Sequence, residues 1–233
     1  MFDVDPHDAG VVTVVSGKGG VGKSVVAVNL AVSLAREGRR IALIDADAGQ
    51  GSCAYLLGHG SDVRLVSPDP SLDAGEALDF LESSLIQLRD WADLVLIDAP
   101  AGIGTLVRWA LDRSDSGLLV LVDEPTAVAD AYALVKMTWR LDPAFPFAGV
   151  VNMADSAVEA ADVVERFSSL TSHFLDRKIL YAGWVPFSDA MRQSVRRQVP
   201  AAATDRAMSR VFGDLAGRVR CGVFPTLAPL AMN

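Results

Sequence analysis

Short apolar runs alternate with longer amphipathic stretches along most of the chain. The runs are rich in Val, Ile and Leu at consecutive positions, which is typical of parallel strands buried on both faces. The longer stretches repeat apolar residues every three or four positions, as helices packed on such a sheet do. We predict strands over Val11–Val15, Arg40–Ile44, Val63–Val66, Leu94–Ile97, Leu118–Val122, Ala148–Val151 and Ile179–Trp184, and helices over Ser24–Glu37, Gly75–Leu88, Thr126–Arg140 and Ser156–Leu170.

Strands that alternate with helices predict right-handed βαβ units. We therefore expect an α/β protein with a doubly wound, mostly parallel sheet in a single domain. We assign 1–10 to a short tail, 11–203 to the sheet domain and 204–233 to a C-terminal helix and tail. Ligands of such sheets bind at the carboxyl ends of the strands. The polar residues predicted to lie there are Asp45, Asp47, Asp98 and Asn152.

The composition is that of a globular protein, since 51% of the 233 residues are hydrophobic and 21% are charged. Two cysteines, Cys53 and Cys221, exclude a disulfide framework and a four-cysteine metal site. The first nine residues contain no apolar run, so we expect no signal peptide. No stretch stays apolar over the ~18 residues of a membrane span. We therefore expect a cytoplasmic protein.

Charge is unevenly distributed along the chain. The net charge of −8 argues against nucleic-acid binding by the whole surface. Residues 191–233, however, contain seven arginines and two aspartates, which gives 7 − 2 = +5 and leaves −8 − 5 = −13 for the remainder. The C-terminal segment is therefore basic in an otherwise acidic protein.

One segment matches the phosphate-binding pattern G-x-x-x-x-G-K-[ST] in full: Gly17-Lys18-Gly19-Gly20-Val21-Gly22-Lys23-Ser24. It lies between a predicted strand and a predicted helix, which is the context that the pattern requires. Glycines let backbone N–H groups turn toward phosphate oxygens, and the helix N-terminus adds partial positive charge. We expect Lys23 to contact the β- and γ-phosphates of ATP and Ser24 to hold Mg²⁺, with Val25 next to the nucleotide.

Lys18 is not part of the ordinary pattern. A second lysine on this loop cannot easily reach the γ-phosphate of its own nucleotide, so it is available to a second molecule; the alternative is a solvent-facing lysine. With Lys18, the segment resembles the deviant Walker A motif of the MinD/ParA family of ATPases (the SIMIBI class). The resemblance implies a homodimer that sandwiches two nucleotides, in which Lys18 contacts the partner's phosphates.

Two acidic strand ends extend the resemblance. Asp45-Ala46-Asp47 matches the family's D-x-D switch, which implies that Asp47 positions the attacking water, and we place Asp45 with the metal. Leu94–Asp98 fits a Walker B strand with Asp98 near Mg²⁺, and 98–102 resembles the family's D-x-P-A-G switch. A turn or helix-cap role is the alternative for Asp47. The residues after Asp47, 48–52, depart from the family pattern.

Two further positions are implied as contacts of the base. In the resembled family the asparagine that corresponds to Asn152 bonds adenine, and an amide can both donate and accept at a base edge. Gly183-Trp184-Val185-Pro186 matches the later base-flanking loop, which places Pro186 beside the base. Turn formation is the alternative for both residues.

Residues 123–136 read D-E-P-T-A-V-A-D-A-Y-A-L-V-K. This block closely resembles the P-E-P-T…D-A-Y-A-L-I-K block of FlhG/FleN-type (YlxH) proteins, MinD-like ATPases that regulate flagellar number and placement. A helix capped by Thr126, with Tyr132 and Leu134 packed inward, is compatible with the resemblance. The first nine residues contain nothing like that branch's activator element for a flagellar GTPase, so coupling to that partner stays open.

The C-terminal segment predicts an amphipathic helix after a cap at Thr204. It can be docked on the domain, or it can adsorb to an anionic membrane when ATP drives dimerisation, as in MinD-like proteins. The apolar positions at helical spacing are Met208, Val211, Phe212, Leu215 and Val219, with Arg206, Arg210 and Arg218 beside them.

The leading hypothesis is a slow ATPase that acts as a dimerisation switch and positions or counts a cellular structure, with flagellar assembly favoured. The alternatives are a MinD-type division-site ATPase and a ParA-type partitioning ATPase that binds DNA non-specifically. A metal or iron–sulfur carrier is disfavoured because the two cysteines have no C-x-x-C spacing. A non-hydrolysing scaffold is disfavoured because Lys23, Ser24, Asp47 and Asp98 are intact.

Overall fold

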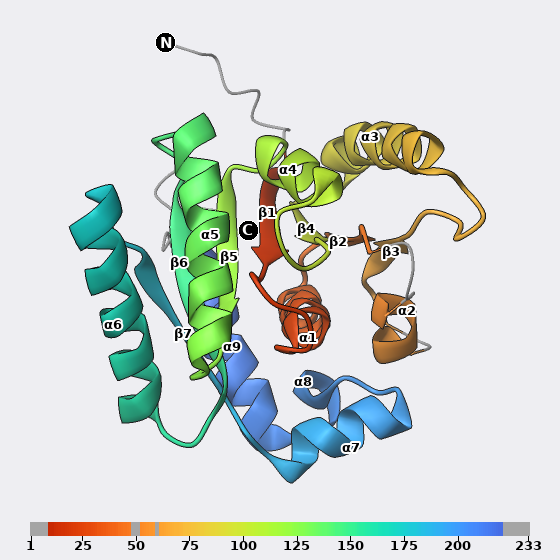
Figure 1. The fold of residues 1–233 in the computed structure, drawn as a ribbon. Coiled ribbons are helices and arrows are strands. Elements are labelled where there is room, and N and C mark those ends of the chain that lie inside the picture. The colour runs from red at the N-terminus through yellow and green to blue at the C-terminus, as the bar shows by residue number, and fades with distance from the viewer. Residues whose placement is uncertain (1–8, 48–51, 59–60, 221–233) are drawn as a thin grey trace.

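In the part of the chain that the structure describes, seven parallel strands form one sheet in the order β3-β2-β4-β1-β5-β6-β7 (Figure 1). The computed structural model describes residues 9–47, 52–58 and 61–220. Each predicted strand is present, and the expected doubly wound α/β fold is confirmed, with every strand pair parallel. The strands are β1 (Gly10–Val15), β2 (Ile41–Asp45), β3 (Arg64–Val66), β4 (Leu94–Asp98), β5 (Ser116–Leu121), β6 (Phe147–Ala154) and β7 (Leu180–Pro186).

Helices cover both faces of the sheet, and each face has its own apolar core. Buried residues of α1, α2, α8 and α9 pack on one face, and those of α3 to α6 pack on the other. The helices are α1 (Lys23–Arg36), α2 (Ser52–Leu57), α3 (Ala74–Trp91), α4 (Thr105–Asp112), α5 (Pro125–Leu141), α6 (Ala157–Leu175), α7 (Asp189–Arg197), α8 (Ala201–Thr204) and α9 (Arg206–Arg220).

Strand β1 shows why the apolar runs are continuous. Val12 and Val14 face the core beneath α1, whereas Val11 and Val15 face the core beneath α4 and α5. Successive side chains of a strand point to opposite faces, so a strand covered on both sides is apolar at nearly every position. The buried exception is Thr13, whose hydroxyl donates to the Ala110 carbonyl at 2.9 Å. The strand is flanked by β4 and β5, and its carboxyl end therefore opens at the centre of the sheet.

The helices that the sequence did not predict are short. Helices α2, α4, α7 and α8 have 6, 8, 9 and 4 residues. Segments of this length contain too few turns for an apolar repeat to stand out. The predicted cap at Thr126 is wrong, because α5 begins at Pro125, whose fixed φ suits the first helical position.

The C-terminal helix α9 is docked on the domain. Its apolar side is buried against α1 and β7 at Met208, Phe212, Leu215 and Val219. The predicted cap at Thr204 is wrong, because the Asp205 carboxylate accepts hydrogen bonds from the backbone N–H groups of the next turn. Residues 1–8 of the predicted tail and residues 221–233, with Cys221, lie outside the described residues. Within the described part, no helix is both long and apolar enough to cross a membrane.

Candidate nucleotide-binding site

The loop between β1 and α1 has the backbone form of a phosphate cradle. Gly20 and Gly22 have φ values of 82° and 81°, in the left-handed region that only glycine adopts at little cost. Gly22 is also the N-cap of α1. A Cβ on Gly19 or Gly20 would meet nothing within 4 Å, so the space in front of the loop is open. The N–H groups of this turn and of the first turn of α1 can therefore point at an anion.

The start of the loop is pressed against α5. A Cβ on Gly17 would lie 2.1 Å from the carbonyl carbon of Asp130 and 2.2 Å from the backbone nitrogen of Ala131. On another side, the Gly102 N–H donates to the Ser16 carbonyl at 3.0 Å. The 123–136 block and the D-x-P-A-G segment are therefore both in contact with the phosphate loop, which the sequence did not indicate for the block.

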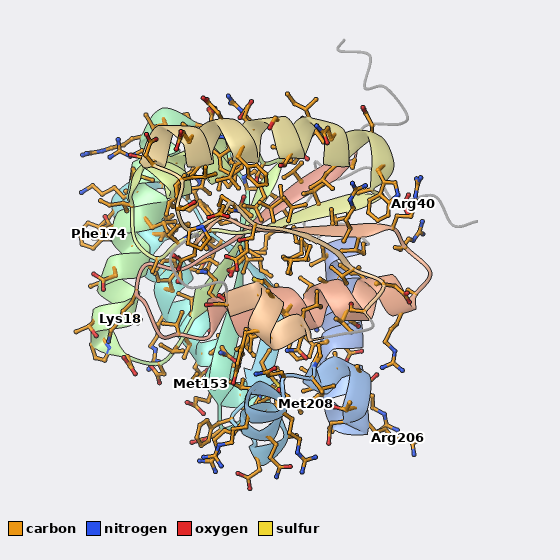
Figure 2. The ribbon with its side chains drawn as sticks, turned by 90° about the vertical axis from the view of Figure 1, so that its right-hand side faces the viewer. Lys18, Arg40, Met153, Phe174, Arg206 and Met208 are labelled. Atoms are coloured by element: carbon orange, nitrogen blue, oxygen red, sulfur yellow. The ribbon has the colours of Figure 1, made fainter. Side chains whose placement is uncertain are left out.

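The two lysines of the loop point to different places. Lys23 is 7% exposed, and its Nζ donates to Asp98 Oδ1 at 2.6 Å. Lys18 is 40% exposed, and its Nζ donates to Glu124 Oε2 at 2.9 Å and to Thr126 Oγ1 at 3.0 Å. Figure 2 shows Lys18 at the outside of the molecule, beside the start of α5. Only Lys23 is thus turned toward the strand ends.

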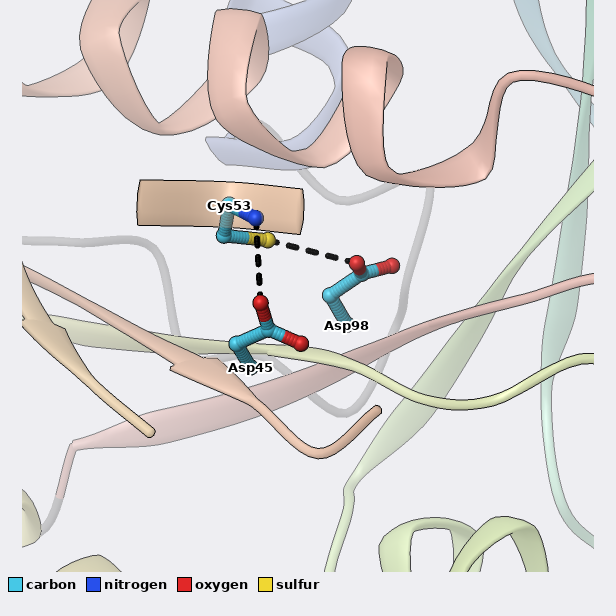
Figure 3. Close-up of side chains that lie close together, drawn as sticks. All are labelled: Asp45, Cys53 and Asp98. Carbon is cyan, nitrogen blue, oxygen red and sulfur yellow. Dashed lines mark hydrogen bonds between the residues drawn. The ribbon is translucent and has the colours of Figure 1, made fainter. Parts of the chain in front are cut away.

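The two aspartates at the ends of β2 and β4 lie side by side. Asp45 and Asp98 are paired in the strand register, and both are fully buried. Cys53 joins them: its backbone N–H donates to Asp45 Oδ2 at 3.0 Å, and its Sγ donates to Asp98 Oδ2 at 3.2 Å (Figure 3). The Asp47 N–H donates to Asp45 Oδ1 at 3.1 Å, which holds Asp47 at the edge of the cluster. The acidic strand ends therefore form one buried group.

Burial and the like charge of neighbouring carboxylates raise the pKa values of Asp45 and Cys53. Burial raises the pKa of Asp45 above its usual range, although hydrogen bonds from Cys53 and Asp47 oppose the shift, and the charge of Asp98 raises it further. Burial, followed by the charges of Asp98 and Asp45, raises the pKa of the Cys53 thiol well above its usual range. The thiol is consequently a hydrogen-bond donor here and not a thiolate. Because it contacts Asp98 across 45 residues, no local sequence pattern could have indicated it.

The donor set fits a hard divalent cation. Ligand atoms of Asp45, Cys53 and Asp98 lie within 4.8 Å of one another. The two buried carboxylates carry more negative charge than Lys23 alone can balance. Mg²⁺ prefers oxygen ligands, and Ser24, in the first turn of α1, adds a hydroxyl to the same end of the sheet. Asp45, Asp98 and Ser24 are thus the residues that could hold Mg²⁺.

Asn152 is attached to the phosphate loop by its side chain. The residue is 5% exposed, and its Nδ2 donates to the Val21 carbonyl at 2.8 Å. The next residue, Met153, has a left-handed φ of 60° and an exposed side chain whose Cε lies 3.5 Å from where a Cβ on Gly22 would be. Pro186 ends β7 opposite Ala154, on the neighbouring strand. The structure therefore brings Asn152 and Pro186 to the same end of the sheet as the loop, and adds Met153, which the sequence did not indicate.

Three of the predicted site residues are only half-buried. Val25 and Ser24 are half-buried in the first turn of α1, and Asp47 is half-buried just before residues 48–51, which lie outside the described residues. The remaining predicted residues, from Gly17 to Lys23 together with Asp45, Asp98 and Asn152, converge at the carboxyl end of the sheet. This is the end at which ligands of doubly wound sheets bind.

Known proteins share sequence similarity with this chain over most of its length. The profile of the CobQ/CobB/MinD/ParA nucleotide binding domain matches residues 12–213. Antiactivator FleN of Pseudomonas aeruginosa is 34% identical over 220 residues, which cover 82% of this chain and 79% of that protein. The flagellum site-determining protein YlxH of Helicobacter pylori is 25% identical and covers 91% of this chain and 83% of its own length. An iron-sulfur cluster carrier protein of Deinococcus radiodurans is 32% identical and covers 90% of this chain and 69% of its own length.

A solved structure has the same fold. The septum site-determining protein MinD of Pyrococcus horikoshii, complexed with Mg-ADP, superposes with a TM-score of 0.73 at 20% sequence identity. The match covers 92% of this chain and 98% of that chain.

Proposed function

Because this chain belongs to the CobQ/CobB/MinD/ParA family of nucleotide-binding domains, we propose that it is a slow ATPase and an ATP-driven dimerisation switch. The single observation that carries the proposal is the divergence of two lysines on one phosphate loop. Lys23 is buried against Asp98, whereas Lys18 faces outward and is held only by surface groups. A lysine in that position is suited to the nucleotide of a second molecule.

In this proposal, the residues of one protomer bind Mg-ATP in defined roles. The N–H groups from Gly19 to Ser24 surround the phosphates, and Lys23 exchanges Asp98 for the β- and γ-phosphates. Ser24, Asp45 and Asp98 would hold Mg²⁺, which supplies neutralisation of phosphate charge. Asp47 orients the attacking water at the edge of the cluster. A homologue crystallised with Mg-ADP supports nucleotide and Mg²⁺ as the ligands of the family.

The orientation of Asn152 supports adenine as the base. One N–H of its Nδ2 is used by the Val21 carbonyl, which fixes the amide and leaves its Oδ1 and its second N–H for a ligand. The oxygen can accept from the exocyclic amino group of adenine while the N–H donates to a ring nitrogen, whereas guanine presents an acceptor and a donor in the reverse order. We assign Asn152 to the adenine edge and Pro186 to its flank, and we expect ATP to be bound in preference to GTP.

In the dimer, each Lys18 contacts the phosphates held by the partner protomer, and hydrolysis returns the protein to monomers. The partner of the switch is therefore a second copy of this chain. We expect hydrolysis to be slow, because completion of each site requires association.

For the cellular role, we propose control of the position or number of flagella. Two relatives support it: one is named an antiactivator and the other a flagellum site-determining protein. The 123–136 block supports it as well, since it contacts the phosphate loop at Gly17 and Lys18. A flagellar GTPase or regulator is the corresponding partner. Iron–sulfur transfer receives less support, because the described part of this chain has a single cysteine, Cys53, which is buried between aspartates.

We also propose a cytoplasmic location with peripheral contact to the inner face of the membrane. Release of α9 is not the route that we propose. Burying one such apolar side chain contributes about 1.5–3 kcal/mol, so exposing Met208, Phe212, Leu215 and Val219 would cost roughly 6–12 kcal/mol. That amount is comparable to the entire stability of a domain, which is typically about 5–15 kcal/mol. We therefore propose that contact with a membrane uses a surface that is exposed while α9 stays docked.

Two measurements test the switch and its role. The ATPase rate per molecule should rise with protein concentration in the wild type and stay flat in Lys18→Ala, while Lys23→Ala should lose nucleotide binding. A deletion strain should have altered flagellar number or position with normal cell length, and Lys18→Ala should fail to complement it. A concentration-independent rate in the wild type would refute the switch. Normal flagella together with misplaced septa would replace the flagellar role by a division-site role.

A further inference from the structure

We propose that an anionic lipid bilayer binds the folded surface made by α7 and the first half of α9, while α9 stays docked. The surface, called here the arginine face, consists of Arg192, Arg196, Arg197, Arg206 and Arg210. The inference rests on the proposed peripheral membrane location, and it specifies which residues of the chain make the contact.

The charges of the arginine face are available to a partner. All five side chains are exposed. Arg192 pairs with Asp189, but Arg196, Arg197, Arg206 and Arg210 form no hydrogen bond or ion pair with another described residue. Four arginines on adjoining elements are therefore available to an anionic partner from outside the chain.

The arginines of α7 and α9 belong to one surface. The two helices meet where the Ser188 hydroxyl at the start of α7 contacts the Met208 sulfur of α9, at 3.9 Å. Gln193 and Arg197 of α7 line a hollow of about 440 Å³ together with Thr204 and Asp205, immediately before Arg206. Figure 2 shows Arg206 pointing away from the body of the protein, whereas Met208 on the same helix turns inward.

Acidic groups on these elements do not cancel the charge. Between residues 189 and 210 there are five arginines and two aspartates, so the net charge is 5 − 2 = +3. Asp189 is engaged by Arg192, and Asp205 caps α9 through two backbone N–H groups. The face is thus a local region of positive potential on a chain of net charge −8.

Apolar side chains beside the arginines favour a bilayer over nucleic acid. Phe187 is 57% exposed, and the guanidinium of Arg192 lies 5.5 Å from its ring centre. Val199, at the other end of α7, is 39% exposed. Aromatic and aliphatic groups among cationic ones suit the headgroup region of a membrane, where the ring enters the boundary and the charges meet lipid phosphates. Duplex DNA would interact with the arginines through its phosphates but would make no use of the apolar side chains.

The burial of one side of α9 determines which side of the helix can contact a membrane. Met208, Phe212, Leu215 and Val219 point into the core, and Arg206 and Arg210 lie on the opposite side. The helix therefore presents its charged side to the surroundings without leaving the domain. An amphipathic helix that inserts into lipid would have to present the side that is buried here.

The expected binding is weak and depends on salt. Each arginine next to an anionic membrane surface strengthens binding by about fivefold, so removal of two should weaken it by roughly 25-fold. The attraction extends over a Debye length of about 10 Å at 0.1 M salt, and binding should therefore fall as salt is raised.

The test is co-sedimentation of the full chain, with ATP and with ADP, on vesicles of phosphatidylcholine with and without about one third phosphatidylglycerol. Arg196→Gln/Arg197→Gln and Arg206→Gln/Arg210→Gln should each lose roughly 25-fold in affinity for the anionic vesicles. Phe187→Ser should also weaken binding. The matched control is Arg140→Gln/Lys178→Gln, which removes two exposed cations near the end of α5 and the start of β7, at the other end of β7 from α7. It should bind like the wild type, and all variants should keep the wild-type melting temperature.

Three outcomes would overturn the inference. If both arginine variants bind as tightly as the wild type while Phe224→Asp in the C-terminal tail abolishes binding, the arginine face is wrong and the membrane location stands. If the wild type binds duplex DNA and not anionic vesicles, or neither of them, both the arginine face and the membrane location are wrong. Concentration-dependent ATP hydrolysis, measured on the same samples, judges the dimer switch independently.

Discussion

The contact between Lys18 and Glu124 has a consequence for association. Lys18 cannot contact a partner's phosphates while its Nζ is held by Glu124 at 2.9 Å and by Thr126 at 3.0 Å. Dimerisation by way of Lys18 must therefore break this contact in both protomers. Replacing the carboxylate by a neutral amide, Glu124→Gln, should lower that cost and strengthen the ATP-dependent dimer.

The size of the effect follows from the exposure of the pair. The Lys18 and Glu124 side chains are 40% and 58% exposed, and ion pairs of this kind contribute about 0.2–1 kcal/mol. Two pairs per dimer contribute about 0.4–2 kcal/mol, which corresponds to a factor of about 2–30 in the dissociation constant. The hydrogen bond to Thr126 remains in the variant, so we expect the lower part of this range, about two- to fivefold.

Sedimentation velocity over a dilution series, with Mg²⁺ and a non-hydrolysable ATP analogue, measures that dissociation constant. The matched control is Asp123→Asn, because Asp123 is the neighbouring residue, loses the same charge, and pairs with Arg166 and not with Lys18. Glu124→Gln should dimerise more tightly than both the wild type and Asp123→Asn, and the difference should shrink at high salt. A weaker dimer in Glu124→Gln would refute this reasoning and would indicate that Glu124 itself contacts the partner.

Three further outcomes are expected. Gly17→Ala should destabilise the fold, because the new Cβ would lie 2.1 Å from the backbone of α5, whereas Gly19→Ala has open space; melting temperatures of the two variants compare them. Asn152→Asp should lose affinity for ATP and much of the preference over GTP in competition titrations, because a carboxylate would face the Val21 carbonyl without a donor. The raised pKa of Asp45 means that the folded state holds this proton more firmly than the unfolded chain, so its contribution to stability is present at low pH and is lost as the pH rises through the folded pKa. Asp45→Asn should therefore gain stability relative to the wild type as the pH rises above the ordinary aspartate pKa of about 4 in urea unfolding, and a constant difference would contradict the assignment.

Strands and loop glycines were predictable because their causes are local. A strand buried on both faces is apolar at nearly every position, as four of the five residues from Val11 to Val15 are, and a phosphate loop needs glycines at fixed spacing. The strand ends Asp45 and Asp98 followed from the order of strands and helices. The strands, the loop glycines and the acidic strand ends depend mainly on local conformation and little on contacts between residues far apart in the sequence.

The contacts across the site were not predictable in this way. Lys18 meets Glu124 across 106 residues, and Cys53 meets Asp98 across 45 residues, so neither pair leaves a periodic trace in the sequence. The cap of α9 was assigned one residue too early because Thr204 and Asp205 are both suitable caps, and tertiary packing decides between them. The packing of α9 on α1 likewise depends on which apolar surface is nearby, which helical spacing alone does not determine.

The central claim is that ATP joins two copies of this chain through Lys18. Sedimentation velocity of the wild type and of Lys18→Ala, each with Mg-ADP and with Mg²⁺ and a non-hydrolysable ATP analogue, tests it most directly when nucleotide affinity is measured in parallel. We predict that the wild type is monomeric with ADP and dimeric with the analogue, and that Lys18→Ala is monomeric with both while it binds the analogue with unchanged affinity. A wild type that stays monomeric with the analogue, or a Lys18→Ala variant that dimerises as the wild type does, would contradict the claim.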